Sequence, residues 1–168
     1  MWYYKDDVRR SIHRFKFYNA RHYAPAYGRL LAMRLLKEFP DGFDAVTWVP
    51  TGPIRKFFRG YDQAHLLARA VAKELGLPCL RLLRKMRNTP PQSGISDAAE
   101  RRANILGSYA MADRKAAAGQ KLLLIDDVIT TGATSAECAR MLMTAGAKEV
   151  YCAAVAAASN DKKSGVYR

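Results

Sequence analysis

The chain has 168 residues, of which 49% are hydrophobic, and this length and composition suit a single domain that buries its own core. No apolar run approaches the roughly 20 residues needed to span a bilayer, and the first residues lack the apolar stretch of a secretory signal, so we expect neither a membrane protein nor an exported one. The formal net charge of +13 favours an anionic partner, either nucleic acid or a small phosphate-rich ligand, over the alternative of a merely basic solvated surface.

The N-terminal part of the chain predicts two helices. In residues 5–18, Val8, Ile12 and Phe15 recur at helical spacing, with basic side chains mostly on the other faces. Residues 23–39 carry a second helical pattern of apolar side chains, and the sequence Pro-Asp-Gly that follows ends it.

The middle of the chain predicts two strands around a helix. Residues 43–49 are rich in Val, Thr and Trp, which is typical of a strand, and the loop sequence Pro-Thr-Gly-Pro follows. Residues 62–75 form a clear amphipathic helix that Gly76 ends. A second strand is predicted over residues 79–83.

From residue 85 to about residue 104 the periodicity disappears, and a loop this long inside a compact domain is usually functional or disordered. A short strand over 105–111 and a turn at 115–119 follow. Residues 121–125 predict a strand buried on both faces, residues 134–145 a helix and residues 150–155 a final strand. This order predicts an α/β fold with a mainly parallel sheet flanked by helices.

Two acids, Asp126 and Asp127, come directly after the buried strand at 121–125. The carboxyl edge of an open parallel sheet is where ligands bind. Adjacent carboxylates are costly there unless hydroxyl groups or a cation meet them. A sugar diol with Mg²⁺ fulfils that need, because Mg²⁺ prefers oxygen ligands and keeps its waters. We therefore expect both acids to hold ribose hydroxyls and Mg²⁺, directly or through water.

A group of small and hydroxyl-bearing residues opens the next helix: Thr130, Thr131, Gly132, Ala133 and Thr134. Small residues let the backbone approach an anion closely, and the free N–H groups and positive dipole end of a helix start favour phosphate. One strand–loop–helix unit thus predicts a diol clamp beside a phosphate cradle, as ribose 5-phosphate requires. The alternative is a chance acidic corner followed by an ordinary helix start.

Residues 122–134 resemble the binding signature for phosphoribosyl pyrophosphate (PRPP) of type I phosphoribosyltransferases, with four apolar residues, two acids, two aliphatics and Thr-Thr-Gly-x-Thr. Motifs at 12–17, 59–64, 87–94 and 100–104 narrow the resemblance to the competence-associated ComF family. Asp62 stands where that family usually has Asn, which leaves an amide hydrogen bond there in doubt. The cysteine-rich zinc module that precedes this domain in many members is absent, so no zinc is expected.

The resemblance implies a type I phosphoribosyltransferase-like fold forming one domain over 1–168, with a small N-terminal helical hood at 1–42, a core at 43–158 and a tail at 159–168. It implies displacement of pyrophosphate from C1 of PRPP by an acceptor, commonly a nitrogen nucleophile, with Mg²⁺ and with Asp126 and Asp127 as catalytic residues. The identity of the acceptor stays open, as does oligomeric state, a homodimer included.

The resemblance also places the pyrophosphate. The loop after the first core strand implies Thr51 and Gly52 as its ligands, with Arg59 following closely, although a plain basic turn is the alternative. Residues 84–104 match the mobile catalytic loop, whose residues here include Lys85, Arg87, Gln92 and Arg101. The sequence does not show which of its basic residues cover the pyrophosphate, and a solvated basic loop is the alternative.

A second hypothesis is a non-catalytic protein of the same fold that senses PRPP or handles single-stranded DNA, since residues 1–60 hold 12 Lys and Arg against 5 Asp and Glu. A third is that the unit holds another sugar phosphate. The odd number of scattered cysteines (Cys79, Cys138 and Cys152) argues against a disulfide framework, so we expect a cytoplasmic location.

Overall fold

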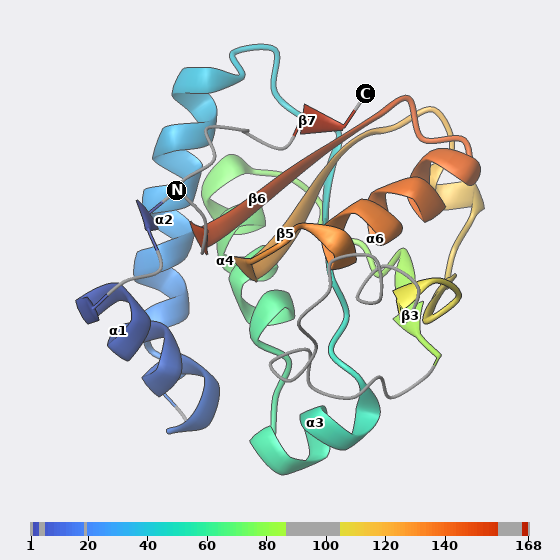
Figure 1. Ribbon diagram of the computed structural model, residues 1–168. Coiled ribbons are helices and arrows are strands. Elements are labelled where there is room, and N and C mark those ends of the chain that lie inside the picture. Colours follow the sequence, from blue (N-terminus) through green and yellow to red (C-terminus); the bar gives the residue numbers. More distant parts are fainter. Residues whose placement is uncertain (1, 4–5, 19, 87–104, 158–165, 168) are drawn as a thin grey trace.

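A computed structural model describes residues 2–3, 6–18, 20–86, 105–157 and 166–167 (Figure 1). A sheet of order β1-β6-β5-β2 forms its centre, and β7 pairs with β6. All of these pairs are parallel except β6 with β7, which confirms the expected mainly parallel α/β fold. The strands are β1 Trp2–Tyr3, β2 Ala45–Trp48, β5 Lys121–Ile129, β6 Glu149–Ala157 and β7 Val166–Tyr167.

Helices cover both faces of the sheet, α2 and α4 on one and α6 on the other (Figure 1). A small antiparallel pair, β3 Leu83–Lys85 with β4 Tyr109–Met111, lies beside α6. The helices are α1 Asp6–Phe17, α2 Tyr23–Glu38, α3 Pro53–Arg59, α4 Gln63–Leu75 and α6 Ala133–Thr144, with a 3-10 turn at Lys115–Ala117. Among the described residues, none of the helices has the length and apolar character needed to cross a membrane.

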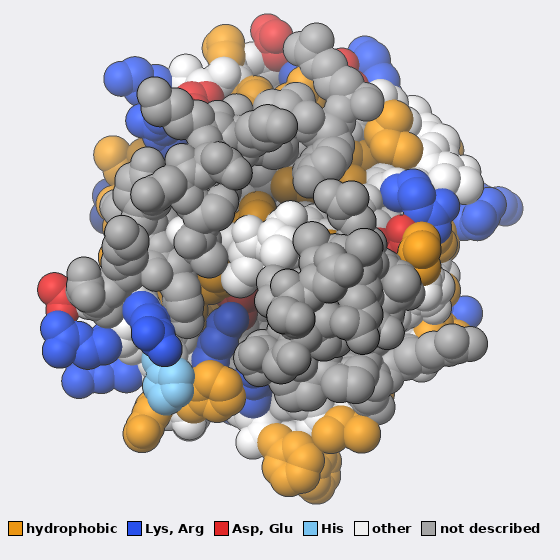
Figure 2. All heavy atoms as spheres, viewed as in Figure 1, with side chains coloured by type: hydrophobic (Ala, Val, Ile, Leu, Met, Phe, Trp, Pro, Cys, Tyr) orange, Lys and Arg blue, Asp and Glu red, His pale blue; other side chains and the backbone are white. Residues whose placement is uncertain are grey.

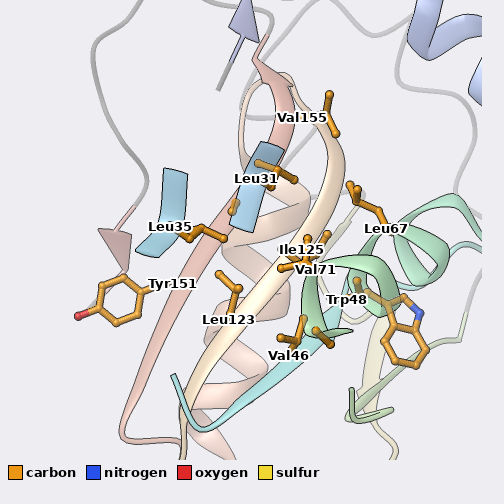
Figure 3. Packing of buried hydrophobic residues seen from close by; sticks show 14 of the residues in the cluster. Leu31, Leu35, Val46, Trp48, Leu67, Val71, Leu123, Ile125, Tyr151 and Val155 are labelled. Carbon is orange, nitrogen blue, oxygen red and sulfur yellow. The ribbon is translucent and has the colours of Figure 1, made fainter. Parts of the chain in front are cut away.

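The alternation of side chains along β5 divides the core into two layers. Leu123 and Ile125 pack with Leu31 of α2 and Val71 of α4, as Figure 3 shows. Leu122 and Leu124 belong instead to the cluster that contains the buried face of α6. Burial on both faces explains why this strand reads as one continuous apolar run.

Two predicted strands differ from the structure, and one helix was not predicted. The strand predicted over residues 105–111 covers only Tyr109–Met111, which form β4. Residues 79–83 do not form a strand of the sheet: Cys79 makes only an isolated bridge to Val46, and the next strand, β3, begins at Leu83 and pairs outside the main sheet. Leu82 and Leu83 are buried all the same, so their apolar pattern reports burial rather than strand pairing. Helix α3 was not predicted, because none of its residues is buried and no apolar stripe marks it.

Candidate functional site

At the carboxyl edge of the sheet β5 extends beyond the end of β2, and the two acids lie on this extension. Trp48 at the end of β2 pairs with Ile125, and the Val49 N–H donates to the Ile125 carbonyl at 2.9 Å. Strand β5 then continues beside β6 alone, with Asp126 opposite Ala154. Asp126 and Asp127 therefore lie beyond the end of β2, beside the loop that leaves it.

Asp126 is held in place by its neighbours and has an altered acidity. One carboxylate oxygen accepts from the Asp127 N–H at 2.8 Å, and the other accepts from the Ser135 hydroxyl at 3.5 Å. Burial, and after it the charge of Asp127, raise the pKa of Asp126 to about 7, while Lys16 acts in the opposite direction. A carboxyl group with such a pKa at a ligand-binding edge is typical of a functional site.

The loop from β5 to α6 forms a small pocket that Asp126 shares with Val128 and residues 129–135. Gly132 takes a left-handed conformation, with φ of 75°, and its carbonyl accepts the first helical bond, from the Ala136 N–H at 2.8 Å. The Thr131 hydroxyl accepts from the Ala133 N–H at 3.4 Å. Gly132, the N-cap residue of α6, makes no side-chain cap hydrogen bond, and the start of a helix favours an anion.

Asp127 makes an ion pair that the sequence did not predict. The Lys16 ammonium, from the last turn of α1, lies 2.9 Å from one oxygen of Asp127. Most of each side chain is out of contact with solvent, with exposed fractions of 20% for Lys16 and 15% for Asp127. The N-terminal helix thus reaches the acid pair directly.

Asp62 fixes the loop after β2. Its carboxylate accepts from the Thr51 N–H at 3.0 Å and from the Thr51 hydroxyl at 3.3 Å. It also caps α4 by accepting from the His65 N–H at 3.2 Å. The carboxylate therefore accepts three hydrogen bonds at the position where the family usually has Asn.

Two further cationic side chains, Arg59 and Lys85, interact electrostatically with the acid pair. Arg59 donates to the Gln63 side chain at 3.0 Å; burial lowers its pKa, while the charge of Asp127 acts in the opposite direction. Lys85 lies over the Tyr109 ring, 5.2 Å from its centroid; burial, and after it Arg55, lower its pKa, while the charge of Asp126 raises it. Each of the two acids therefore interacts electrostatically with a further cationic side chain.

The structure thus places Asp126 in one pocket with the threonine-rich loop, with Asp127 next to it in the chain. Thr51 is bound to Asp62. The charges of Asp127 and Asp126 act on the pKa values of Arg59 and Lys85, respectively. Gly52 precedes α3 in an extended conformation. Arg87, Gln92 and Arg101 lie outside the described residues.

Sequence reasoning missed Lys16, Ser135 and Tyr109 as members of the site. Lys16 belongs to the motif at residues 12–17, which was the available signal, but nothing in that motif names Asp127 as its partner.

The acid pair fits a magnesium ion of the kind that a phosphorylated ligand brings. No group of three or more His, Cys, Asp or Glu that could hold a metal ion occurs among the described residues. Mg²⁺ commonly binds through one or two carboxylates, with water and substrate phosphates as its other ligands. Asp126 and Asp127 suit that arrangement.

Comparison with family models gives a match to the phosphoribosyl transferase domain over residues 62–167. Competence protein F of Haemophilus influenzae is 33% identical over 83% of this chain and 63% of its own length. Competence protein ComFC of Bacillus subtilis is 31% identical, over 85% and 56%, and the DNA utilization protein YhgH of Salmonella typhimurium is 30% identical, over 84% and 64%. The chain therefore spans about three fifths of the length of these relatives.

Solved structures show the same fold. The allosteric regulatory enzyme of purine biosynthesis is 25% identical, with a TM-score of 0.50 over 78% of this chain and 26% of that one. The glutamine PRPP amidotransferase from B. subtilis is 24% identical, with a TM-score of 0.53 over 80% and 26%. The second likeness supports the fold alone.

Proposed function

This chain belongs to the phosphoribosyl transferase domain family, and from that premise we propose that it binds PRPP with Mg²⁺ and transfers the phosphoribosyl group to a nitrogen acceptor. The observation that carries the proposal is the carboxyl end of β5, where Asp126 shares a pocket with the threonine-rich loop and the start of α6, and Asp127 follows it in the chain. A sugar 5-phosphate has a diol for the carboxylates and a phosphate for the helix start. The relatives named for competence place the chain in the ComF branch of the family.

The two halves of the site divide the ligand between them. Asp126 and Asp127 hold the ribose hydroxyls and, with water, the Mg²⁺, which neutralises negative charge on the ligand. The N–H groups around Gly132 and the hydroxyls of Thr131 and Thr134 hold the 5-phosphate. Fixing both ends of the sugar orients C1 toward the acceptor.

The leaving pyrophosphate belongs on the side of the loop after β2. Thr51 is held there by Asp62, and Arg59 and Lys85 provide positive charge close to the acids. These groups stabilise the negative charge that develops as the bond from C1 breaks. The predicted mobile loop, with Arg87, Gln92 and Arg101, would exclude water from the cationic sugar.

The first test is the melting temperature with Mg²⁺ and PRPP. At about a hundredfold excess over Kd, the ligand should raise the melting temperature by about 5 °C or more, because it binds only the folded state. The double variant Asp126→Asn with Asp127→Asn should lose this shift, whereas Asp41→Asn, at an exposed position, should keep it. A wild-type protein whose melting temperature does not change would contradict the proposal.

Transfer itself is tested by release of pyrophosphate from PRPP in the presence of purine and pyrimidine bases and other nitrogen nucleophiles. Release that depends on one acceptor class supports the transferase. Binding of PRPP without release in any mixture would favour the non-catalytic PRPP sensor instead.

A second candidate function rests on a separate groove. Between α1 and the start of α2, basic and aromatic side chains line an open groove of Arg9, Arg10, His13, Arg14, Tyr18, Ala20, His22 and Tyr23. Figure 2 shows Lys and Arg side chains gathered around a histidine at the lower left, over α1. Positive charge for phosphates combined with rings for stacking is the chemistry that binds single-stranded nucleic acid. This groove favours single-stranded DNA as a second ligand.

A further inference from the structure

Lys16 makes a direct ion pair with Asp127, and this pair is not a surface ion pair. The two charged groups lie 2.9 Å apart with exposed fractions of 20% and 15%. Exposed ion pairs contribute little, but a pair largely withdrawn from water interacts more strongly because less solvent screens it.

The main chain beside Lys16 is anchored as well. The Tyr61 hydroxyl donates to the Phe15 carbonyl, and the Gln63 side chain donates to the Lys16 carbonyl at 3.4 Å. The Phe15 side chain is 1% exposed and packs with Tyr61. The start of α4 therefore fixes the last turn of α1, and the ammonium is delivered to Asp127 by a held backbone.

Adjacent carboxylates at the edge of a sheet attract divalent cations whether or not a substrate accompanies them. With Lys16 in contact, Asp127 is neutralised by the protein itself, and its oxygen is occupied by a hydrogen-bond donor. A free metal ion has to displace this ammonium, and gains only the carboxylates in return. A metal ion that arrives with PRPP also brings phosphate oxygens for the displaced ammonium.

We propose that Lys16 is an internal counter-cation that lowers the affinity of Asp126 and Asp127 for free divalent metal and reserves them for metal bound to PRPP. The inference rests on the proposed function and names a positioning residue for it. When PRPP binds, its metal and ribose hydroxyls replace the ammonium at Asp127. The ammonium then meets the pyrophosphate beside Arg59.

The test measures binding of Mn²⁺, a paramagnetic substitute for Mg²⁺, by electron paramagnetic resonance without PRPP. Lys16→Met removes the charge but keeps much of the side-chain length, and should bind free Mn²⁺ about fivefold more tightly than the wild type. Lys16→Arg restores a cation that can pair with Asp127 and should bind Mn²⁺ as weakly as the wild type. Lys37→Met, at an exposed position of α2, removes the same charge elsewhere and should have no effect.

Equal Mn²⁺ affinity in Lys16→Met and the wild type overturns the inference, as does an equal gain in Lys37→Met, since the effect is then one of net charge. Thermal melting of each variant confirms that it is folded at the temperature of the titration. Failure of the proposed function shows separately, as a wild-type melting temperature that Mg²⁺ with PRPP does not change. A wild type that responds to PRPP beside a Lys16→Met variant with unchanged Mn²⁺ affinity overturns the inference alone.

Discussion

At the level of single residues, Asp126 combines a raised pKa with a place on the proposed ribose clamp. Burial makes its ionised form costly, and the adjacent Asp127 adds repulsion. Ionisation is the state that the ligand needs, because hydroxyl groups and Mg²⁺ both bind the carboxylate. The ionised form of Asp126 therefore lowers the stability of the ligand-free protein, and the same ionised form binds the ligand.

A pH dependence of stability follows. The unfolded chain releases this proton near the ordinary value of 3.8 and the folded chain near 7, so the folded state holds more protons between these values and stability falls as pH rises through that window. Asp126→Asn removes this loss and should be more stable than the wild type at pH 8 by about 1 kcal/mol or more, with a smaller difference near pH 4.

Urea unfolding of both proteins at the two pH values measures the difference, with Glu74→Gln, at an exposed position, as the control. A wild type that gains stability over Asp126→Asn as pH rises would show that the protein environment favours the ionised form.

Asp62 has two roles, of which only one can be predicted from the sequence. Its place before a helical pattern predicts an N-cap, and it does accept from the His65 N–H. Its second task, binding both the N–H and the hydroxyl of Thr51, joins segments 11 residues apart and has no local signal. Two carboxylate oxygens receive three donors here, a number that the single carbonyl oxygen of Asn serves less well.

At the level of elements, α2 and α4 approach so closely that Gly28 has no room for a side chain. A Cβ atom at Gly28 would lie 2.5 Å from the Ala70 Cβ and 2.9 Å from the Ala70 carbonyl carbon. Gly28→Ala should therefore destabilise the protein by about 1–3 kcal/mol through overpacking, although alanine favours helix formation by about 1 kcal/mol over glycine.

Denaturant unfolding of Gly28→Ala tests this packing. Arg29→Ala, at an exposed position of the same helix, should change stability by less than about 0.5 kcal/mol. If Gly28→Ala is as stable as the wild type, the two helices lie further apart than described.

The elements that the sequence predicted well are those whose side chains face the core. The predicted helices at 5–18, 23–39 and 62–75 match α1, α2 and α4 to within one residue at each end. Helix α3 was not predicted because Ile54, Phe57 and Phe58 are exposed to solvent, and hydrophobic periodicity marks only buried faces. Its ends were nonetheless signalled, by Pro53 at the first turn and by Gly60, which takes the left-handed conformation that ends the helix.

At the level of the whole molecule, the net charge of +13 favours contact with polyanions. The basic groove beside α1 is the site where we propose that single-stranded DNA binds. Binding of a fluorescent oligothymidine, measured by anisotropy, should weaken about tenfold between roughly 50 and 200 mM salt, because each phosphate contact releases counterions. Arg10→Gln with Arg14→Gln should weaken it further, whereas Arg29→Gln with Lys37→Gln loses the same charge on α2 and should not. Salt-independent binding, or equal loss in both double variants, would argue against this groove.

Some residues of the candidate site are close together in the sequence, and others are brought together only by the fold. The acids and the threonine-rich loop lie within one strand–loop–helix unit, so residues 122–134 alone predict their juxtaposition. Lys16 reaches Asp127 across more than a hundred residues of sequence, through the docking of α1 on α4. Contacts of that kind depend on how the layers pack, and no local pattern encodes them.

Strand β6 has partners at both ends of its outer side, since β7 pairs with Val150 and Tyr151 while β1 pairs with Ala156 and Ala157. An uncovered edge offers its backbone N–H and C=O groups to any passing strand and is the usual starting point of amyloid-like aggregation. The four residues of β1 and β7, from opposite ends of the described chain, thus pair backbone groups at both ends of this edge that would otherwise be open to another strand.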